Sequence, residues 1–139
     1  MHCILLLVAH GGIHNKNKKK KEKRTRQFRI KEFTFFRHDS TGKMQSLPSN
    51  AEDNEILNAH AATLYISNQK NGHAGACMHH TAIIDNVWSC PVKTLARRYT
   101  HIRQHTSNRK AFICTYFDEA GMGSVTDNQI CFAIKFVGW

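Results

Sequence analysis

Cysteine and histidine are the residue types in this sequence that could bind a metal ion. The chain has ten histidines and five widely spaced cysteines, namely Cys3, Cys77, Cys90, Cys114 and Cys131. His101 and His105 have the spacing of the histidine pair in a zinc finger. The cysteines do not fit, because twelve residues separate Cys77 from Cys90 where a finger has about two to four. We therefore expect reduced thiols in an intracellular protein, and no metal or other cofactor.

Lys70 is placed where a long cationic side chain could reach into a groove. It lies in the string Asn68-Gln69-Lys70-Asn71-Gly72, and an Asn-Gly pair is a strong signal for a hairpin turn. Two interpretations stay open from these residues alone: a solvated lysine at a hairpin tip, or a cation that contacts phosphate. The sequence holds no G-x-S-x-G, P-loop or H-E-x-x-H motif that would indicate a different chemistry.

Positive charge is concentrated near the N-terminus. Residues 16–31 hold ten of the twenty Lys and Arg and one acid, so they carry +9, whereas the other 123 residues carry ten cations and nine acids, hence +1. Such a tract binds phosphate without reading base sequence, so nucleic acid is the first partner to expect. Nuclear import and a solvated linker are the alternatives. The tract residues predicted to contact DNA are Lys18, Lys19, Lys20, Lys21, Arg24 and Arg26.

Length and hydropathy favour one small globular domain. The chain has 139 residues, of which 41% are hydrophobic and 22% charged, as in ordinary globular proteins. No apolar run approaches the roughly 20 residues of a membrane helix. The short apolar run 3–9 lacks the preceding positive charge of a signal peptide. We expect an intracellular protein, nuclear if the tract is an import signal, without a membrane partner; no oligomeric state follows from the sequence.

Hydrophobic periodicity predicts three strands in the first part of the chain. Residues 28–36 alternate apolar and polar side chains, with a phase change that indicates a bulge near Glu32. Residues 39–58 are polar and predict a long loop. Residues 62–67 and 76–82 are expected to pair as a hairpin around the Asn-Gly turn.

A helix is predicted to start at Pro91, with Ser89 or Cys90 as its cap. Its apolar face is Val92, Leu95, Ala96, Tyr99 and Ile102. The cations Lys93, Arg97 and Arg98 lie on its other faces, where they are either DNA contacts or a solvated helix surface.

The last part of the chain predicts one extended run and one helix. Residues 112–117 are apolar, and Gly121-Met122-Gly123 should end that run. Thr126 and Gln129 have the spacing of a capping box at the start of a helix. The expected buried face of that helix is Ile130, Ala133, Ile134 and Val137. The predicted class is α+β, a small antiparallel sheet of about three strands on two or three helices.

Several strings in this order resemble the catalytic domain of the tyrosine recombinase (phage integrase) superfamily, most of all integrase-like proteins of protist mobile elements. The most specific are N-Q-K-N-G at residues 68–72 and C-P-V-K-T-L-A-R-R at residues 90–98. The resemblance covers roughly residues 27–137. It implies an incomplete integrase-type catalytic domain over residues 28–139, preceded by an apolar segment (1–15) and the basic tract (16–27).

The resemblance also implies a chemistry, which is DNA strand exchange through a phosphotyrosine. In that family two arginines hold the scissile phosphate, a hairpin lysine acts as general acid and a tyrosine attacks. Lys70 matches the hairpin lysine. Leu7 stands where the first arginine is expected, and the His-x-x-Arg box and the tyrosine lie beyond the last helix in the family. Tyr65, Tyr99 and Tyr116 lie upstream of that point and are expected to be core or strand residues.

We therefore expect a truncated or decayed recombinase that binds DNA, in which Lys70 is a vestigial general acid and strand cleavage is absent. The alternative is a non-enzymatic basic protein that binds nucleic acid or acidic partners through the tract alone. A third hypothesis is a poorly folded chain, since nothing follows the last helix to cover its apolar face.

Overall fold

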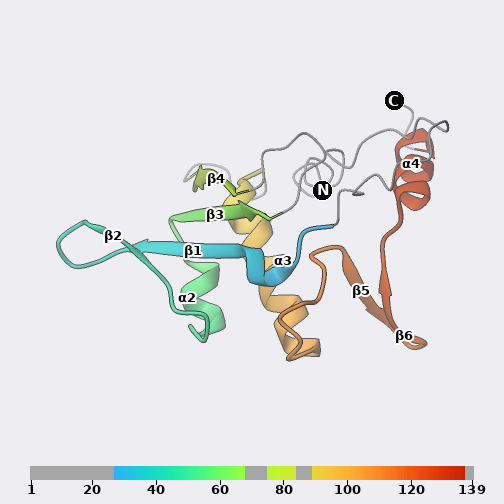
Figure 1. Cartoon of the computed structure of the whole chain (residues 1–139), viewed down its shortest axis with the longest axis horizontal. Coiled ribbons are helices and arrows are strands. Elements are labelled where there is room, and N and C mark those ends of the chain that lie inside the picture. The colour runs from blue at the N-terminus through green and yellow to red at the C-terminus, as the bar shows by residue number, and fades with distance from the viewer. Residues whose placement is uncertain (1–26, 68–74, 84–88, 137–139) are drawn as a thin grey trace.

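An antiparallel sheet with helices on one face forms the centre of the computed structural model, which describes residues 27–67, 75–83 and 89–136 (Figure 1). The α+β class is therefore confirmed. The elements in chain order are η1 (Ile30–Glu32), β1 (Phe33–His38), β2 (Met44–Ser46), α2 (Asp53–Leu57), β3 (Ala61–Ile66), β4 (Ala76–Thr81), α3 (Pro91–His105), β5 (Thr115–Asp118), β6 (Gly121–Ser124) and α4 (Asp127–Phe136).

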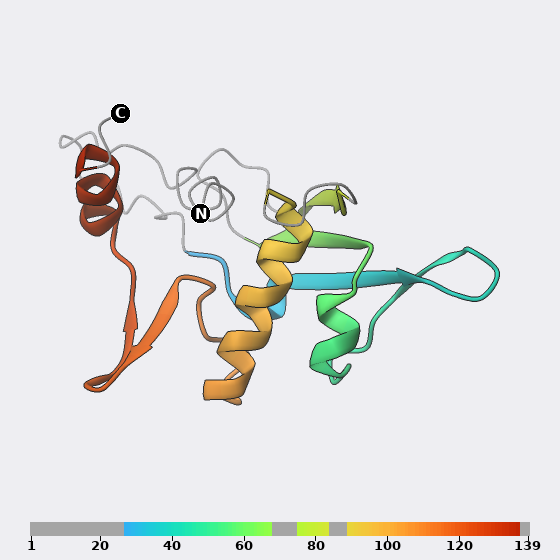
Figure 2. The ribbon, with the colours of Figure 1, turned by 180° about the vertical axis from the view of Figure 1, so that it is seen from behind.

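The main sheet has the strand order β2-β1-β3-β4, with every neighbouring pair antiparallel. In β1, Phe33 lies opposite Leu64 and Phe35 lies opposite Ala62 of β3. These four side chains are buried, and since side chains alternate along a strand they share one face of the sheet. Both α2 and α3 cover that face (Figure 2), so the core lies between the sheet and these helices.

The predicted loop over residues 39–58 was wrong in part, because it contains β2 and α2. Asp39 closes the turn that brings β2 beside β1: its Oδ1 accepts the backbone N–H groups of Thr41 (2.8 Å) and Lys43 (3.0 Å). Gly42 takes a positive φ of 81° in the same turn. All three residues of β2 are exposed, so this strand has no apolar alternation that a sequence pattern could reveal, and the sheet has four strands instead of about three.

The phase change near Glu32 has a different cause from the predicted bulge. A single 3-10 turn, η1, precedes β1, and the strand itself begins at Phe33. The turn is closed by the Glu32 backbone N–H on Arg29 O (3.0 Å) and by the Arg29 N–H on Glu32 Oε2 (2.8 Å). The turn shifts the alternation by one residue, as a bulge would.

Helix α3 agrees with its prediction from Pro91 onward. Cys90 is the N-cap residue and Pro91 is the first helical residue, where its missing N–H leaves no hydrogen bond unmade. Four residues of the predicted apolar face are buried and Leu95 packs against them as a half-buried side chain. The buried four are Val92, Ala96, Tyr99 and Ile102.

The glycines at 121 and 123 form a strand instead of ending one, which corrects the sequence prediction. Strand β6 pairs with β5, and Gly123 lies opposite Tyr116. A Cβ atom on Gly123 would overlap the Tyr116 ring, so the absence of a side chain is what lets the ring lie across the partner strand.

Helix α4 starts with the predicted capping box. The Gln129 N–H donates to Thr126 Oγ1 (3.3 Å), and the Thr126 N–H donates to Gln129 Oε1 (2.8 Å). The expected buried face is not buried in its described part, since Ile130 is half-buried and Ala133 is exposed; the side chains of Ile134 and Val137 lie outside the description. Figure 1 shows why: α4 stands apart from the sheet, beyond β6.

Candidate nucleic-acid-binding surface

The predicted DNA contacts fall into two groups. Lys70 and the tract residues lie outside the described residues. The remaining three lie on α3 within two turns of one another, and the structure gives them different surroundings. The tract residues concerned are Lys18, Lys19, Lys20, Lys21, Arg24 and Arg26. Those on α3 are Lys93, Arg97 and Arg98.

Lys93 is half-buried and bonds inside the molecule. Its Nζ donates to Leu57 O (2.9 Å) and to Ala59 O (3.1 Å). Leu57 is the last residue of α2, and the last carbonyls of a helix lack partners within the helix. Lys93 thus caps α2 and joins it to α3.

Arg98 is also half-buried and bonds to the backbone. Its Nε donates to Ile113 O at 2.9 Å, which ties α3 to the segment that leads into β5. Burial lowers the pKa of the Arg98 guanidinium, with Cys114 acting in the opposite direction. The main role of the Arg98 side chain is therefore to stabilise the fold.

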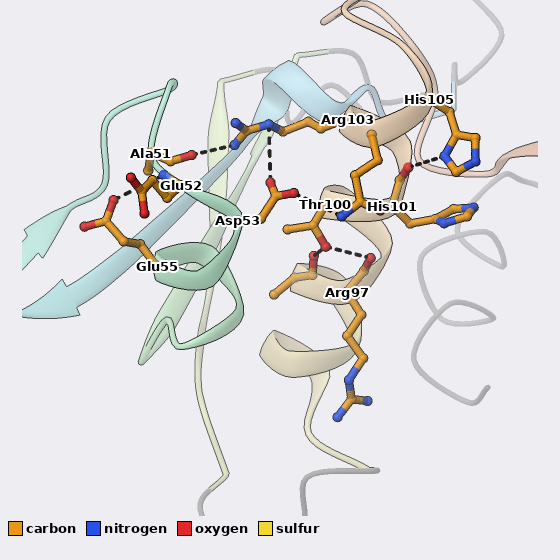
Figure 3. A network of polar contacts seen from close by, with 11 residues as sticks. Ala51, Glu52, Asp53, Glu55, Arg97, Thr100, His101, Arg103 and His105 are labelled. Atoms are coloured by element: carbon orange, nitrogen blue, oxygen red, sulfur yellow. Dashed lines mark hydrogen bonds and ion pairs between the residues drawn. The ribbon is translucent and has the colours of Figure 1, made fainter.

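Arg97 is the exposed cation of the three. Figure 3 shows its guanidinium directed away from Asp53 and the rest of the polar network between α2 and α3. Of the three predicted contacts on α3, Arg97 is therefore the one whose side chain is exposed.

The acidic side chains of α2 are matched by cations and amides of the folded body. Arg103 Nη1 donates to Ala51 O (2.9 Å) and its Nε lies 3.8 Å from Asp53 Oδ1, as drawn in Figure 3. Gln104 Nε2 donates to the other Asp53 oxygen (3.1 Å). On the far side of α2, Arg37 pairs with Glu55 at 2.5 Å. These cations are used within the fold and stabilise the packing of α2.

Four cations lie together where the chain enters the domain: two end the basic run of residues 16–31, and two that the sequence did not indicate come from residues 109–110. We call them the basic edge: Arg29, Lys31, Arg109 and Lys110. Residues 28–31 run beside residues 109–113, joined by hydrogen bonds from Ile30 N to Ala111 O (2.9 Å) and from Lys31 N to Arg109 O (3.2 Å). The signal in the sequence was the alternation of cations with Phe28 and Ile30, but only the fold brings residues 109–110 beside them.

The histidines of the suspected zinc spacing pack on an aromatic ring. The His105 ring stacks on Phe117 with centroids 4.5 Å apart, and His101 lies 4.5 Å from His105. The His101 side chain is exposed, but partial desolvation, then His105 and then Arg98, lower its pKa. Within residues 27–67, 75–83 and 89–136, no three His, Cys, Asp or Glu side chains are grouped to hold a metal ion.

The three tyrosines are core or strand residues, as expected. Tyr99 is buried, with its ring edge-on to Phe35 at 5.1 Å. Tyr65 and Tyr116 lie in β3 and β5. None of them is a residue of the basic edge, and Tyr99, although it is in α3 like Arg97, is on the buried face of that helix.

No family model, curated protein or solved structure matches this chain. Among the described residues, no helix has both the length and the apolar character needed to cross a membrane.

Proposed function

We propose that this chain binds duplex DNA through its phosphates, as a recombinase-like protein that does not itself cut or join strands. The observation that carries the proposal is the charge of +9 concentrated in residues 16–31. A duplex presents about one negative charge per 1.7 Å of axis, and each phosphate neutralised releases counterions. A dense run of lysines and arginines suits that array better than it suits an isolated acidic group.

Several cations of the folded body already bond within the protein, which supports the assignment of DNA binding mainly to the basic tract. Lys93, Arg98 and Arg103 donate to backbone carbonyls, and Arg37 pairs with Glu55. The first three side chains hold the fold together, whereas Arg37 is exposed and its surface ion pair contributes little. Binding then rests on the tract and on exposed cations such as Arg97.

Lys70 alone would not sustain phosphoryl transfer. The family that the sequence resembles needs arginines to stabilise charge on the phosphate and a tyrosine to attack it. Removing one such charge-stabilising group costs about 10²–10³ in rate. Tyr99 is enclosed in the core, and Leu7 stands at the place of the first arginine.

Binding is tested by titrating the full chain with a 20-base-pair duplex at several KCl concentrations. We expect log Kd to rise with log salt by about 0.9 for each phosphate neutralised. Binding that is absent, or unchanged by salt, would contradict the proposal. A nicked duplex that traps covalent intermediates tests the claim that the chain does not cut or join strands. A protein–DNA adduct would show that cleavage activity is present.

The alternative function is a basic protein that binds polyanions through the tract alone. The observation that favours it is the charge of only +1 on the residues outside 16–31. Deleting residues 16–26 distinguishes the proposed function from this alternative. Residual duplex binding by the shortened chain supports a contribution from the folded body, whereas loss of binding to DNA and to heparin alike supports the alternative.

A further inference from the structure

The basic edge is built on a short antiparallel pairing of two distant segments. Ile113 N donates to Phe28 O (2.8 Å) and Ile30 N donates to Ala111 O (2.9 Å). Arg29 and Phe112 form the bridge between these two bonds. The pairing fixes the side-chain directions of both segments.

Alternation along this pairing sorts apolar from cationic side chains. Successive side chains of extended backbone point to opposite faces. The residues on one face are buried in the core: Phe28, Ile30, Ala111 and Ile113. Arg29 and Phe112 lie on the other face, where the Arg29 guanidinium carbon is 5.5 Å from the centre of the Phe112 ring. Lys31 and Lys110 are exposed next to them.

A closed turn holds Arg109 and Lys110 in place. Asn108 Oδ1 accepts the Lys110 N–H (2.9 Å), and Asn108 O accepts the Ala111 N–H (2.9 Å). The Asn108 N–H in turn donates to Thr106 Oγ1 (3.1 Å). Backbone fixed before binding loses less conformational entropy on association, so this turn is suited to present two cations to a ligand.

The charge of the basic edge is not cancelled locally. Lys31, Arg109 and Lys110 form no ion pair with any other residue that the structure describes. Glu32, the acid next to them in sequence, accepts the Arg29 N–H (2.8 Å) with one oxygen and the Ser67 hydroxyl with the other. Glu32 forms no ion pair with a lysine or arginine among the described residues.

We propose that the basic edge is a second phosphate-binding surface, which places the folded domain on the same duplex that the basic tract binds. The inference rests on the proposed DNA binding. Arg29 lies three positions after Arg26, the last cation of the tract, and three extended residues span at most about 10 Å. Phosphates along one strand of a duplex are about 3.4 Å apart along the axis, so tract and edge reach neighbouring phosphates.

The test compares charge removal at the basic edge with charge removal elsewhere. The edge variant is Arg109→Gln with Lys110→Gln, and Lys110→Gln alone is compared with Lys43→Gln, an exposed lysine in the β1–β2 turn. Each is titrated with the 20-base-pair duplex from 50 to 300 mM KCl. We expect the salt slope to fall by about 1.8 in the double variant and about 0.9 in Lys110→Gln, and to stay unchanged in Lys43→Gln. Thermal unfolding checks that all variants fold alike.

The outcomes separate the two proposals. Salt-dependent binding by the unaltered chain, with the same slope in the double variant, would overturn the basic edge and leave DNA binding standing. Equal losses in Lys110→Gln and Lys43→Gln would also overturn it, because the effect would then be one of net charge. Absence of duplex binding by the unaltered chain, with binding to phosphatidylserine vesicles instead, would overturn both.

Discussion

Lys93 and Arg97 lie one turn apart on α3, but the structure gives them different surroundings. The Lys93 ammonium bonds to two carbonyls at the end of α2. The Arg97 guanidinium is exposed and directed away from the polar network between α2 and α3. Residue type and helical spacing did not distinguish them, because the partner of Lys93 comes from a segment more than thirty residues earlier.

This difference predicts opposite effects of two substitutions. Lys93→Met leaves the Leu57 and Ala59 carbonyls without their donor, so the free energy of unfolding should fall by about 1–2 kcal/mol while duplex affinity stays the same. Arg97→Gln should weaken duplex binding and lower its salt slope by about 0.9, with a smaller effect on stability. Urea unfolding and duplex titration of both variants check this. A loss of affinity in Lys93→Met without loss of stability would contradict it.

His101 predicts a pH dependence of stability. Its pKa in the folded chain is lowered, first by burial and then by His105 and Arg98, whereas an unfolded histidine has a pKa of about 6.5. As the pH falls below that value, the unfolded state binds the proton more readily, so stability is lost as the pH falls toward the folded pKa.

The measurement is the melting temperature of the chain at pH 7.5 and pH 5.5. We expect a lower value at pH 5.5, and a smaller difference in His101→Gln. His80→Gln, which removes an exposed histidine of β4, serves as the matched control. An equal pH dependence in His101→Gln and the unaltered chain would exclude His101 as its source.

At the scale of elements, α4 depends on its cap more than on packing. It stands apart from the sheet (Figure 1), and its Phe132 side chain is 69% exposed. Among the described side chains of α4 none is buried, and Ile130 is half-buried. Local interactions therefore matter more for this helix than for α3, and the Thr126–Gln129 capping box is the clearest of them.

Gln129→Ala should therefore loosen α4 without unfolding the sheet. Loss of a capping interaction costs about 1 kcal/mol, so amide hydrogen exchange should speed up several-fold over residues 130–133 and stay unchanged in β1 and β3. Gln129→Glu keeps the acceptor oxygen and should preserve protection. Equal exchange in the alanine and glutamate variants would show that the box does not hold the helix.

At the scale of the whole molecule, the core between the sheet and α3 should unfold as one unit. Ile102 is completely buried against it, and truncating such a side chain removes both transfer free energy and packing contacts. Ile102→Ala should lower the free energy of unfolding by about 2–5 kcal/mol. Met122→Ala, at a side chain that is 61% exposed, should change it by less than about 0.5 kcal/mol.

Urea unfolding followed by circular dichroism and by fluorescence checks this prediction. Coincident transitions indicate one cooperative unit. Transitions that separate, or a small effect of Ile102→Ala, would favour the hypothesis of a poorly folded chain.

The local signals in the sequence were enough to predict β1, β3, β4, α3 and α4, together with the α+β class. Each of these carries its own pattern, such as the apolar face of α3 or the Thr126–Gln129 spacing, and needs no distant partner to be recognised. The charge distribution, which carries the proposed function, is also a property of the sequence alone.

Tertiary structure decided what depends on distant partners. Strand β2 exists through its pairing with β1, and β6 through its pairing with β5, where Gly123 leaves room for the Tyr116 ring. It also decided which cations bind inside the fold and which face outward. Hydrogen bonds such as that of Arg98 to Ile113 O, and the placing of Arg109 beside Lys31, join segments whose proximity arises only when the chain packs around a shared core.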